Sequence, residues 1–447
     1  MIHNREQLAR SRTHAVALDC LTAGIEAADP ARLTRDAVSV ADDTLTVGEA
    51  SYDLADYEEV IVLGGGKAAA VVAAELEAIL GDHLDSGIVV TDSPRSTERI
   101  EVLSGDHPIP SEIGVENTRR LLDDAAAANE STLILAVITG GGSALMAAPA
   151  DGLSLADLRS TTDALLASGA TINEINAVRK HCSAIKGGHL AAATQPADVC
   201  SLVVSDVVGN DLSTIASGPL VGDPTTYADA SAVIDRYDLD IPVTVADRLA
   251  RGAAGEIEET PAPGDPIFEK VATTIIGDGL TAVRAAADRA READFDPLIL
   301  SSRIRGEARE AAKTQVAIAE ETAATGEPLD PPAVVVSGGE TTVSVAGDGT
   351  GGPNQEFALS AAIELVDGSD DVASDTVVAA VDTDGIDGVS DAAGAIVDSD
   401  TTTAAAGQRA LAANDATPLL ADAGALIHTG ATGTNVNDLR VVVVPKL

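Results

Sequence analysis

Short, fully apolar runs recur along the chain, each followed by a polar or glycine-rich turn and then by a longer segment with helical spacing. Residues 60–63 and 133–138 are two such runs, and their branched apolar residues predict strands buried on both faces. Alternation of buried strands with helices is typical of α/β proteins that have a parallel sheet. The pattern therefore predicts an α/β fold built from βαβ units.

The alternation is interrupted between residues 238 and 266, where proline, glycine and glutamate are frequent and helical spacing is weak. We interpret residues 241–265 as the passage between two α/β domains. The first domain is expected to span residues 1–240, and the second residues 266–447.

Three of the predicted strands run into glycine-rich turns. These turns are Gly64, Gly65 and Gly66 followed by Lys67; Gly140, Gly141 and Gly142 followed by Ser143; and Gly338 and Gly339 followed by Glu340. Backbone N–H groups that are bare at the start of a helix bind anions such as phosphate. Open parallel sheets bind ligands at the carboxyl ends of their strands. We therefore expect these turns to hold phosphate groups.

Lys67 stands in the first turn of a predicted helix, where a cation opposes the helix dipole unless an anion is bound. The chain has only six lysines, so this placement indicates a functional contact. The alternative is a solvated lysine beside an ordinary glycine turn.

Asn176, Arg179 and Lys180 have the spacing of one helix face. Three cations, Arg179, Lys180 and Lys186, lie within about two helical turns and are conspicuous in an acidic chain, and we expect Arg179 and Lys180 to contact an anionic substrate. The alternative is a set of surface pairs with neighbouring acidic residues.

Aspartates follow two of the predicted strands directly. Asp206 comes after the strand at residues 199–205, and Asp382 and Asp384 come after the strand at residues 377–381. An aspartate at such a place suits a Mg²⁺ ligand or a group that orients a nucleophile. Ordinary turn chemistry is the alternative, because Asp and Asn also stabilise loops.

Acidic residues outnumber basic ones by 71 to 28, which gives a formal net charge of −43. The acidity is spread over the whole chain, so we interpret it as an adaptation to concentrated salt, where the Debye length falls to about 3 Å. The sequence has no basic patch, which argues against partners that are nucleic acids or anionic membranes.

The three cysteines, Cys20, Cys182 and Cys200, have no metal-site or disulfide spacing and are predicted to be buried thiols. The apolar runs are too short to span a membrane, and the N-terminus does not resemble a signal peptide. We expect a cytoplasmic protein, and a homodimer is left open.

Several nucleotide-binding motifs can be compared with the first turn. A P-loop requires the pattern GxxxxGK[ST], which the turn at Gly64 lacks, and protein-kinase motifs are missing. The run Gly64-x-Gly66-x-x-Ala69 does match a relaxed dinucleotide fingerprint, with Asp92 near the position of a ribose-binding acid. An NAD(P)-dependent reductase is therefore a serious alternative.

Ordered motifs extend through the chain: Gly64-Gly-Gly-Lys-Ala-Ala-Ala, Gly105-Asp-His-Pro-Ile-Pro, Thr139-Gly-Gly-Gly-Ser-Ala-Leu, Asn176-Ala-Val-Arg-Lys-His, Val204-Ser-Asp-Val-Val-Gly-Asn, Ala216-Ser-Gly-Pro, Gly338-Gly-Glu-Thr-Thr, Asn354-Gln-Glu-Phe-Ala-Leu, Asp382-Thr-Asp-Gly-Ile-Asp-Gly and Gly433-Thr-Asn-Val-Asn-Asp-Leu. Together they make the chain resemble the class II glycerate kinases over nearly its whole length. That family joins a Rossmann-like N-terminal domain to a smaller C-terminal α/β domain of the MOFRL type. The resemblance implies ATP- and Mg²⁺-dependent phosphorylation of D-glycerate at the 2-hydroxyl, which gives 2-phosphoglycerate.

The resemblance also implies roles for particular residues. Lys67 matches a lysine thought essential in the family. The motif at Gly351-Gly-Pro-Asn-Gln-Glu356 has Pro353 where the family has a catalytic arginine, so either a nearby cation replaces it or this branch of the family works differently. The candidates for that cation are Arg179, Lys180, Arg303 and Arg305.

The expected site has four groups of residues. They are the catalytic residues Lys67, Asp206 and Arg179; the nucleotide-binding residues Gly64, Gly65, Gly66, Gly140, Gly141, Gly142, Ser143, Gly338, Gly339, Glu340 and Asn354; the substrate-binding residues Lys180, Asn210, Asp382 and Asp384; and the metal ligands Asp206 and Asp382.

Three alternatives stay open at this point. The first is an NAD(P)-dependent hydroxypyruvate reductase, and the second is a glycerate 3-kinase that produces 3-phosphoglycerate. The third is a regulator that binds ATP without turning it over.

Overall fold

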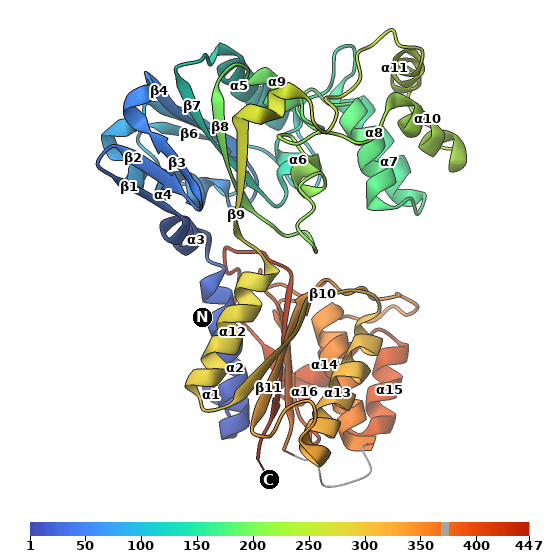
Figure 1. Ribbon diagram of the computed structural model, residues 1–447. Coiled ribbons are helices and arrows are strands. Elements are labelled where there is room, and N and C mark those ends of the chain that lie inside the picture. Colours follow the sequence, from blue (N-terminus) through green and yellow to red (C-terminus); the bar gives the residue numbers. More distant parts are fainter. Residues whose placement is uncertain (368–374, 447) are drawn as a thin grey trace. The chain divides into compact units, whose positions relative to one another are not determined.

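The computed structural model describes residues 1–367 and 375–446 and divides the chain into two compact units (Figure 1). The N-terminal unit comprises Leu33–Ile276, and the C-terminal unit comprises Met1–Arg32 together with Gly277–Leu447. Each unit contains a six-stranded sheet covered by helices, which confirms the predicted α/β fold. None of the helices in the described part of the chain is both long enough and apolar enough to cross a membrane.

The sheet of the N-terminal unit has the strand order β6-β5-β4-β7-β8-β9. In chain order its strands are β4 (Glu59–Gly65), β5 (Ser86–Thr91), β6 (Ile100–Ser104), β7 (Thr132–Thr139), β8 (Asp198–Val204) and β9 (Val271–Gly277). The ladders from β6 through β8 are all parallel. The chain builds outward from β4 in one direction through β6 and then crosses to β7 on the other side. The neighbours β4 and β7 therefore form the switch point of the sheet.

Helices and a small antiparallel sheet complete the N-terminal unit. The helices are α3 (Pro30–Ala37), α4 (Ala69–Leu80), α5 (Glu112–Ala127), α6 (Gly142–Leu145), α7 (Leu155–Ala167), α8 (Ile172–His181), α9 (His189–Ala193), α10 (Tyr227–Arg236) and α11 (Val243–Ala253). The small sheet consists of β1 (Val38–Ala41), β2 (Thr44–Val47) and β3 (Ala50–Asp53). Short 3-10 turns occur at Leu54–Asp56, Gly81–His83, Ile215–Ser217 and Pro266–Lys270.

The sheet of the C-terminal unit is mixed and has the order β10-β11-β15-β12-β13-β14. Its strands are β10 (Asp296–Ile304), β11 (Ala333–Gly339), β12 (Val377–Asp382), β13 (Gly394–Val397), β14 (Leu426–Ile427) and β15 (Asp438–Val444). β11 and β12 are both antiparallel to β15. The carboxyl ends of these two strands therefore lie on either side of the amino end of β15.

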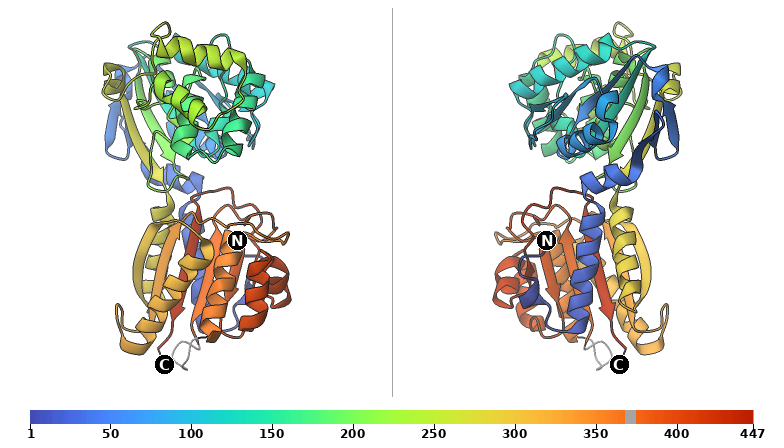
Figure 2. Two further views of the ribbon diagram at one scale, coloured as in Figure 1. Left: turned by 90° about the vertical axis from the view of Figure 1, so that its right-hand side faces the viewer. Right: turned by 90° about the vertical axis from the view of Figure 1, so that its left-hand side faces the viewer.

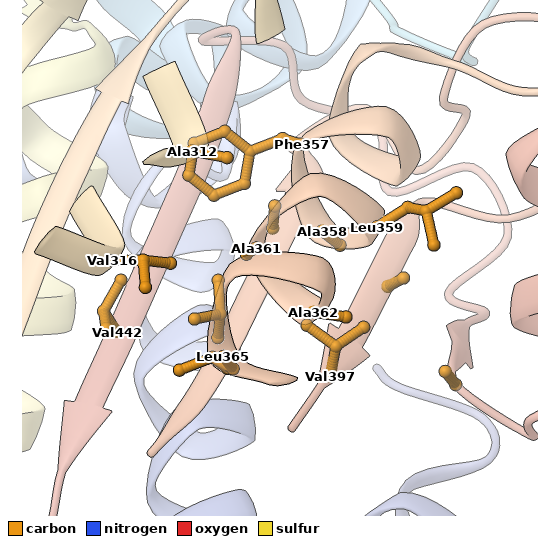
Figure 3. Close-up of a cluster of buried hydrophobic side chains, with 14 of the residues drawn as sticks. Ala312, Val316, Phe357, Ala358, Leu359, Ala361, Ala362, Leu365, Val397 and Val442 are labelled. Carbon is orange, nitrogen blue, oxygen red and sulfur yellow. The ribbon is translucent and has the colours of Figure 1, made fainter. Parts of the chain in front are cut away.

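The helices of this unit cover both faces of its sheet. They are α1 (Arg5–Leu8), α2 (Arg12–Ala27), α12 (Gly279–Glu292), α13 (Ala308–Thr325), α14 (Pro353–Asp367), α15 (Ala404–Ala412) and α16 (Ala416–Asp422). Figure 2 shows α2 beside α12, although the two are far apart in sequence. Figure 3 shows the core on the other face, where Phe357 and Ala361 of α14 lie near Val442 of β15. Alanine dominates this core because the chain has few aromatic residues.

The N-terminal unit begins and ends at other residues than the expected first domain, 1–240. Residues 1–32 were expected in the first domain, but α2 packs on α12, β12 and β15 of the C-terminal unit. Gly24 allows this close packing, because a Cβ atom there would lie 2.4 Å from Leu439 Cδ2. An amphipathic helix signals a buried face, but its sequence does not say which sheet that face covers.

Residues 241–265 were expected to form the passage between domains, but they belong to the N-terminal unit. They contain α11, whose Val245 and Leu249 are buried in a cluster with residues of α8 and α10. β9, which was expected in the second domain, joins the edge of the N-terminal sheet. The chain crosses between the units near residues 32 and 276 instead. The three cysteines are buried free thiols, as predicted.

Replacing Leu21 of α2 by Ala should destabilise the C-terminal unit, because Leu21 is fully buried. The expected loss in the free energy of unfolding is about 2–5 kcal/mol. Denaturant unfolding measures the loss, and hydrogen exchange should show faster exchange in α12. Leu166→Ala is the control, because Leu166 is 64% exposed and its removal should cost less than about 0.5 kcal/mol. Faster exchange in α5 with α12 unchanged would contradict the packing of α2 described above.

Candidate active site

Three candidate loops of the N-terminal unit lie at the ends of adjacent strands. Gly64 and Gly65 are the last residues of β4, and Gly66 follows that strand. The second glycine turn follows β7, and Asp206 lies two residues beyond the end of β8. Parallel ladders join β4 to β7 and β7 to β8. The three loops therefore lie side by side at the carboxyl edge of the sheet, at its switch point.

Glycine is required where these loops meet, because the backbone and side chains approach too closely for a Cβ atom. A Cβ atom at Gly64 would lie 2.0 Å from the carbonyl oxygen of Val137. A Cβ atom at Gly66 would lie 2.1 Å from Thr139 Oγ1. Both glycines also have positive φ angles, of 150° and 134°, which L-residues rarely adopt.

The first turn uses its N–H groups to hold the loops together. The N–H of Gly66 donates to the carbonyl oxygen of Val90, that of Lys67 to Gly140, and that of Ala68 to Thr139 Oγ1. The expectation that bare N–H groups of this turn bind an anion is therefore wrong for these three residues. The turn ties β4, β5 and β7 into one rigid edge instead.

The second turn has the property that was expected of the first. The N–H groups of Gly141, Gly142 and Ser143 open α6, and within the described residues they have no hydrogen-bond acceptor. Successive free N–H groups at a helix start form a concavity that binds anions. Ser143 is fixed at the end of this turn, with its Oγ 2.5 Å from Ser217 Oγ. Ser217 in turn donates to Asn176 Oδ1 over 3.2 Å.

Lys67 and Asp206 both lie against the second turn. A Cβ atom at Gly141 would lie 3.0 Å from Lys67 Cγ, and one at Gly140 would lie 2.1 Å from Asp206 Oδ2. Burial raises the pKa of Asp206, and the Lys67 charge acts in the opposite direction. His107 joins the same group of residues, because its Cδ2 would lie 3.3 Å from that Cβ atom at Gly141.

Arg179 and Lys180 are adjacent in sequence but differ in their surroundings. Lys180 is buried, and its Nζ lies 3.3 Å from Asp223 Oδ1. Asp223 also accepts hydrogen bonds from Thr225 and Thr260, so the pair is satisfied inside the protein. The expectation that Lys180 binds substrate therefore conflicts with its position. Arg179 is half-buried and makes no ion pair within the described residues, and burial lowers its pKa.

Lys186 was not singled out as a site residue from the sequence. Its side chain is fully enclosed, and its Nζ donates to the carbonyl oxygen of Ser143 over 2.7 Å. Burial and the positive charge of Arg179 lower the pKa of Lys186 to about 7. The sequence does show a third cation close to Arg179 and Lys180. Spacing alone could not tell which of the three side chains faces the second glycine turn.

Asn210 lies in the loop after β8 and has a left-handed backbone, with φ of 60°. Its N–H donates to the carbonyl oxygen of Val207, so its conformation belongs to a tight turn. Its role in substrate binding stays a prediction.

The remaining predicted residues belong to the C-terminal unit and are considered there by themselves. Gly339 of β11 and Asp382 of β12 are both paired in register with Asp438 of β15. Burial and the neighbouring carboxylate of Asp384 raise the pKa of Asp382 well above its usual range, with smaller contributions from Asp438 and Asp387. The sheet thus brings four aspartates together at one edge, including Asp438, which the sequence analysis had not chosen.

Asn354 is fully buried at the start of α14, which conflicts with the expected contact to a nucleotide. Its Nδ2 donates to Asp387 Oδ1 over 3.2 Å and to Asp438 Oδ1 over 2.7 Å. Asp387 accepts the N–H groups of Asn354 and Gln355 and so caps the helix. Pro353 suits the first position of this helix, since it has no N–H group and a fixed φ.

Arg440 lies behind the aspartates and is completely buried. Its guanidinium forms an ion pair with Asp438, donates to Thr341 Oγ1 over 2.8 Å and stacks 4.8 Å from the Phe357 ring centre. Arg440 therefore offsets part of the negative charge of the cluster. Glu340 is exposed beyond Gly339, and its N–H donates to the carbonyl oxygen of Ile304.

No group of three or more His, Cys, Asp or Glu side chains in residues 1–367 and 375–446 is arranged to hold a metal ion. A Mg²⁺ ion that arrives bound to nucleotide phosphates needs only one or two carboxylates from the protein. Asp206 in the N-terminal unit and, considered by itself, Asp382 in the C-terminal unit each have a carboxylate that fits this mode of binding and not an all-protein cage. Their role as metal ligands stays a prediction.

Comparison with known proteins extends over almost the whole chain. Residues 16–250 match a domain family of unknown function, DUF4147, and residues 333–438 match the MOFRL family. A glycerate 2-kinase from Pyrococcus horikoshii is 39% identical over 430 residues, which cover 94% of each chain. A D-glycerate 2-kinase from Thermotoga maritima is 38% identical over 86% of this chain and 90% of its own. The chain belongs to the glycerate 2-kinase family with a MOFRL domain.

Solved structures agree with this assignment. The crystal structure of a glycerate kinase from Thermotoga maritima has a TM-score of 0.84 and 36% identity, with 96% of this chain and 98% of that chain covered. A crystal structure of a Pyrococcus horikoshii protein gives the same TM-score at 38% identity and covers 97% and 98% of the two chains. The family also contains a relative from Agrobacterium vitis that is named provisionally as a hydroxypyruvate reductase, 43% identical over 86% of this chain and 87% of its own.

Replacing Gly140 by Ala should reduce activity without unfolding the N-terminal unit. The new Cβ atom would lie 2.1 Å from Asp206 Oδ2, so this carboxylate must move away. A displacement of this size in a catalytic group lowers kcat/KM by about 100-fold. Steady-state kinetics with a circular dichroism spectrum checks both points.

Gly114→Ala is the matched control, since the nearest atoms to its Cβ position are 3.4 Å away. Its activity should stay within about twofold of wild type, as expected for a substitution that displaces no neighbour. Full activity in Gly140→Ala would show that the position of Asp206 is unimportant.

Proposed function

We propose that this protein transfers the γ-phosphoryl group of ATP to the 2-hydroxyl of D-glycerate and forms 2-phosphoglycerate. The observation that carries the proposal is the second glycine turn, which presents free N–H groups to an anion at the switch point of the sheet. Membership of the glycerate 2-kinase family supports the same reaction. The acidic composition makes these N–H groups and the nearby cations the natural binding site for anionic substrates.

The N-terminal unit supplies groups that suit phosphoryl transfer. The N–H groups of Gly141, Gly142 and Ser143 would bind phosphate oxygens, and Lys67 would offset negative charge that moves during transfer. The substrate hydroxyl forms the new O–P bond as the bond from the γ-phosphorus to the β-bridging oxygen breaks. ADP leaves with that electron pair. The hydroxyl proton requires an acceptor, for which Asp206 is suitable because burial favours its protonated form.

Mg²⁺ would balance the charge of the ATP phosphates. Asp206 is the carboxylate of the N-terminal unit that we propose as a protein ligand. In the C-terminal unit, considered by itself, Asp382 stays the sequence-based candidate for a metal ligand, and Asp382 and Asp384 stay candidates for substrate contacts. Arg179 is the proposed cation in place of the family arginine at Pro353, because its charge acts on Lys186 beside the second turn and it makes no ion pair within the described residues.

A reductase is the second candidate, favoured by the name of the Agrobacterium relative. The dinucleotide fingerprint needs the N–H groups of its glycine turn to bind a pyrophosphate. In this chain the N–H groups of Gly66, Lys67 and Ala68 already donate to Val90, Gly140 and Thr139. The kinase is therefore the better-supported function.

An assay in molar KCl with ATP, Mg²⁺ and D-glycerate tests the proposed reaction. Coupling through enolase, pyruvate kinase and lactate dehydrogenase, without phosphoglycerate mutase, should oxidise NADH, because enolase accepts only the 2-phosphate. The coupling enzymes must first be shown to work in this salt, or samples must be diluted before coupling. A signal that needs added mutase would indicate a 3-kinase. In a separate assay that contains only the protein, NADH and hydroxypyruvate, oxidation of NADH would indicate a reductase. Nucleotide binding without either reaction would indicate a regulator.

Lys67→Ala should lower kcat by about 100- to 1,000-fold, the loss typical of removing one group that stabilises transition-state charge. The fold should be retained, because the Lys67 side chain is exposed. Lys313→Ala is the control, since Lys313 forms only an exposed pair with Glu310 and should keep wild-type kcat. A near-normal rate in Lys67→Ala would remove this lysine from the mechanism.

A further inference from the structure

Two cations beside the second glycine turn make no ion pair, although the chain is strongly acidic. Arg179 and Lys186 form none within the described residues, whereas acidic residues outnumber basic ones by 71 to 28. No carboxylate contributes to the shifted pKa of either side chain, and the one charge that acts on Lys186 is the positive charge of Arg179. Lys186 is buried and Arg179 is half-buried, and a buried positive charge close to a second one is unfavourable unless an anion joins them.

Hydrogen bonds fix the place of this pair relative to the turn. Lys186 Nζ donates to the carbonyl oxygen of Ser143, which leaves the other donors of an ammonium group without acceptors in the described chain. The backbone after Lys186 is anchored as well, because the N–H of Gly187 donates to the carbonyl oxygen of Ser217. Ser217 bonds to Asn176, which lies one helical turn before Arg179 on α8.

The loop that anchors Lys186 has a costly backbone. Ala216 and Ser217 both have positive φ angles, of 49° and 62°, which non-glycine residues seldom adopt. Ser217 is nevertheless held there by bonds to Ser143, Asn176 and Gly187. The strain is thus located where the turn, Asn176 and Lys186 are brought together.

We propose that Lys186 and Arg179, together with the free N–H groups of the second glycine turn, form a subsite for an oxyanion of the substrates. The inference rests on the proposed kinase function and names a residue that it had not used. The oxyanion has two sources, the carboxylate of D-glycerate and a phosphate of ATP, and both present the same chemistry to these groups.

Lys180 provides a matched comparison for Lys186. Both lysines are buried, but Lys180 has Asp223 as its partner and Lys186 has no carboxylate. Removing one half of a buried ion pair leaves the other charge buried without its partner, whereas removing Lys186 leaves only the carbonyl oxygen of Ser143 without its donor. Lys180→Met should therefore lower the unfolding temperature more than Lys186→Met does.

Kinetics separates the two sources of the oxyanion. If Lys186 binds the carboxylate, the ratio of kcat/KM for D-glycerate to that for D-glyceramide should fall by about 10- to 100-fold in Lys186→Met, the value of a hydrogen bond to a charged group. If it binds a phosphate, that ratio should not change and KM for ATP should rise by a similar factor. ADP release is the readout, because it serves both acceptors. Lys186→Arg should recover part of the loss, and Lys180→Met should leave the ratio and KM for ATP at wild-type values.

Proton uptake on anion binding tests the role of Lys186 directly, because a lysine with a purely structural role would not change it. A bound anion raises the pKa of Lys186 from about 7, so at pH 8 the protein should take up a proton on binding. Titration calorimetry with D-glycerate, and separately with inorganic pyrophosphate, in two buffers of different ionisation enthalpy measures this uptake. The other ionisable groups near this loop are Arg179, His189, the Lys180–Asp223 pair, and Lys67 with Asp206 beyond the turn. Lys186→Arg and Lys186→Met should both lose the uptake.

Failure of this inference is distinct from failure of the proposed function. A wild-type enzyme that makes 2-phosphoglycerate while Lys186→Met keeps its substrate ratio, its KM for ATP and its proton uptake would overturn the inference alone. A wild-type protein that makes no 2-phosphoglycerate would overturn the proposed function. In that case the calorimetry still decides the subsite, because it requires no turnover, and equal affinities in wild type and Lys186→Met would reject it.

Discussion

The close approach of the chain where β4 and β7 end is the constraint on which the candidate site depends. At Gly64 and Gly66 no Cβ atom fits between the first turn and β7, so the two strand ends meet through backbone alone. The N–H groups of the first turn are used in holding this contact, which fixes the second turn in place with its own N–H groups free. The two similar glycine turns therefore differ in their use because of how the sheet packs. A rigid strand edge of this kind holds N–H donors in place for the negative charge of a phosphoryl group in transfer.

Charge gives the site its second property. In a chain with a net charge of −43, an anionic substrate meets repulsion over most of the surface. Most buried cations in the structure are neutralised within the protein, as Lys180 is by Asp223 and Arg440 is by Asp438. Lys67, Arg179 and Lys186 make no ion pair within the described residues, and all three belong to the N-terminal unit near the second turn. Positive charge without a counterion inside the protein is thus present beside the second turn, where we propose that anions bind.

Much of this arrangement could be predicted from the sequence, because buried strands and glycine turns have strong local signals. The strand predicted at residues 60–63 is part of β4, and that at residues 133–138 is part of β7. Partners distant in sequence could not be predicted. The pattern of α2 indicated a buried face without identifying the C-terminal sheet, and Lys180 and Lys186 were indistinguishable until Asp223 and Ser143 were placed beside them. Asp438 was missed for the same reason, because its relation to Asp382 comes from the register of β15 with β12.

The two glycine turns also show why the motif alone was ambiguous between a kinase and a reductase. A glycine has at least two uses at a strand end: it permits a close backbone approach, or it exposes N–H groups to a ligand. The fingerprint at Gly64 serves the first use, since its N–H donors are bonded within the protein, and the turn at Gly140 serves the second. The acceptor of each N–H group, which only the structure provides, separates these uses. We therefore propose that anions bind at Gly141, Gly142 and Ser143, where Lys186 contacts the turn.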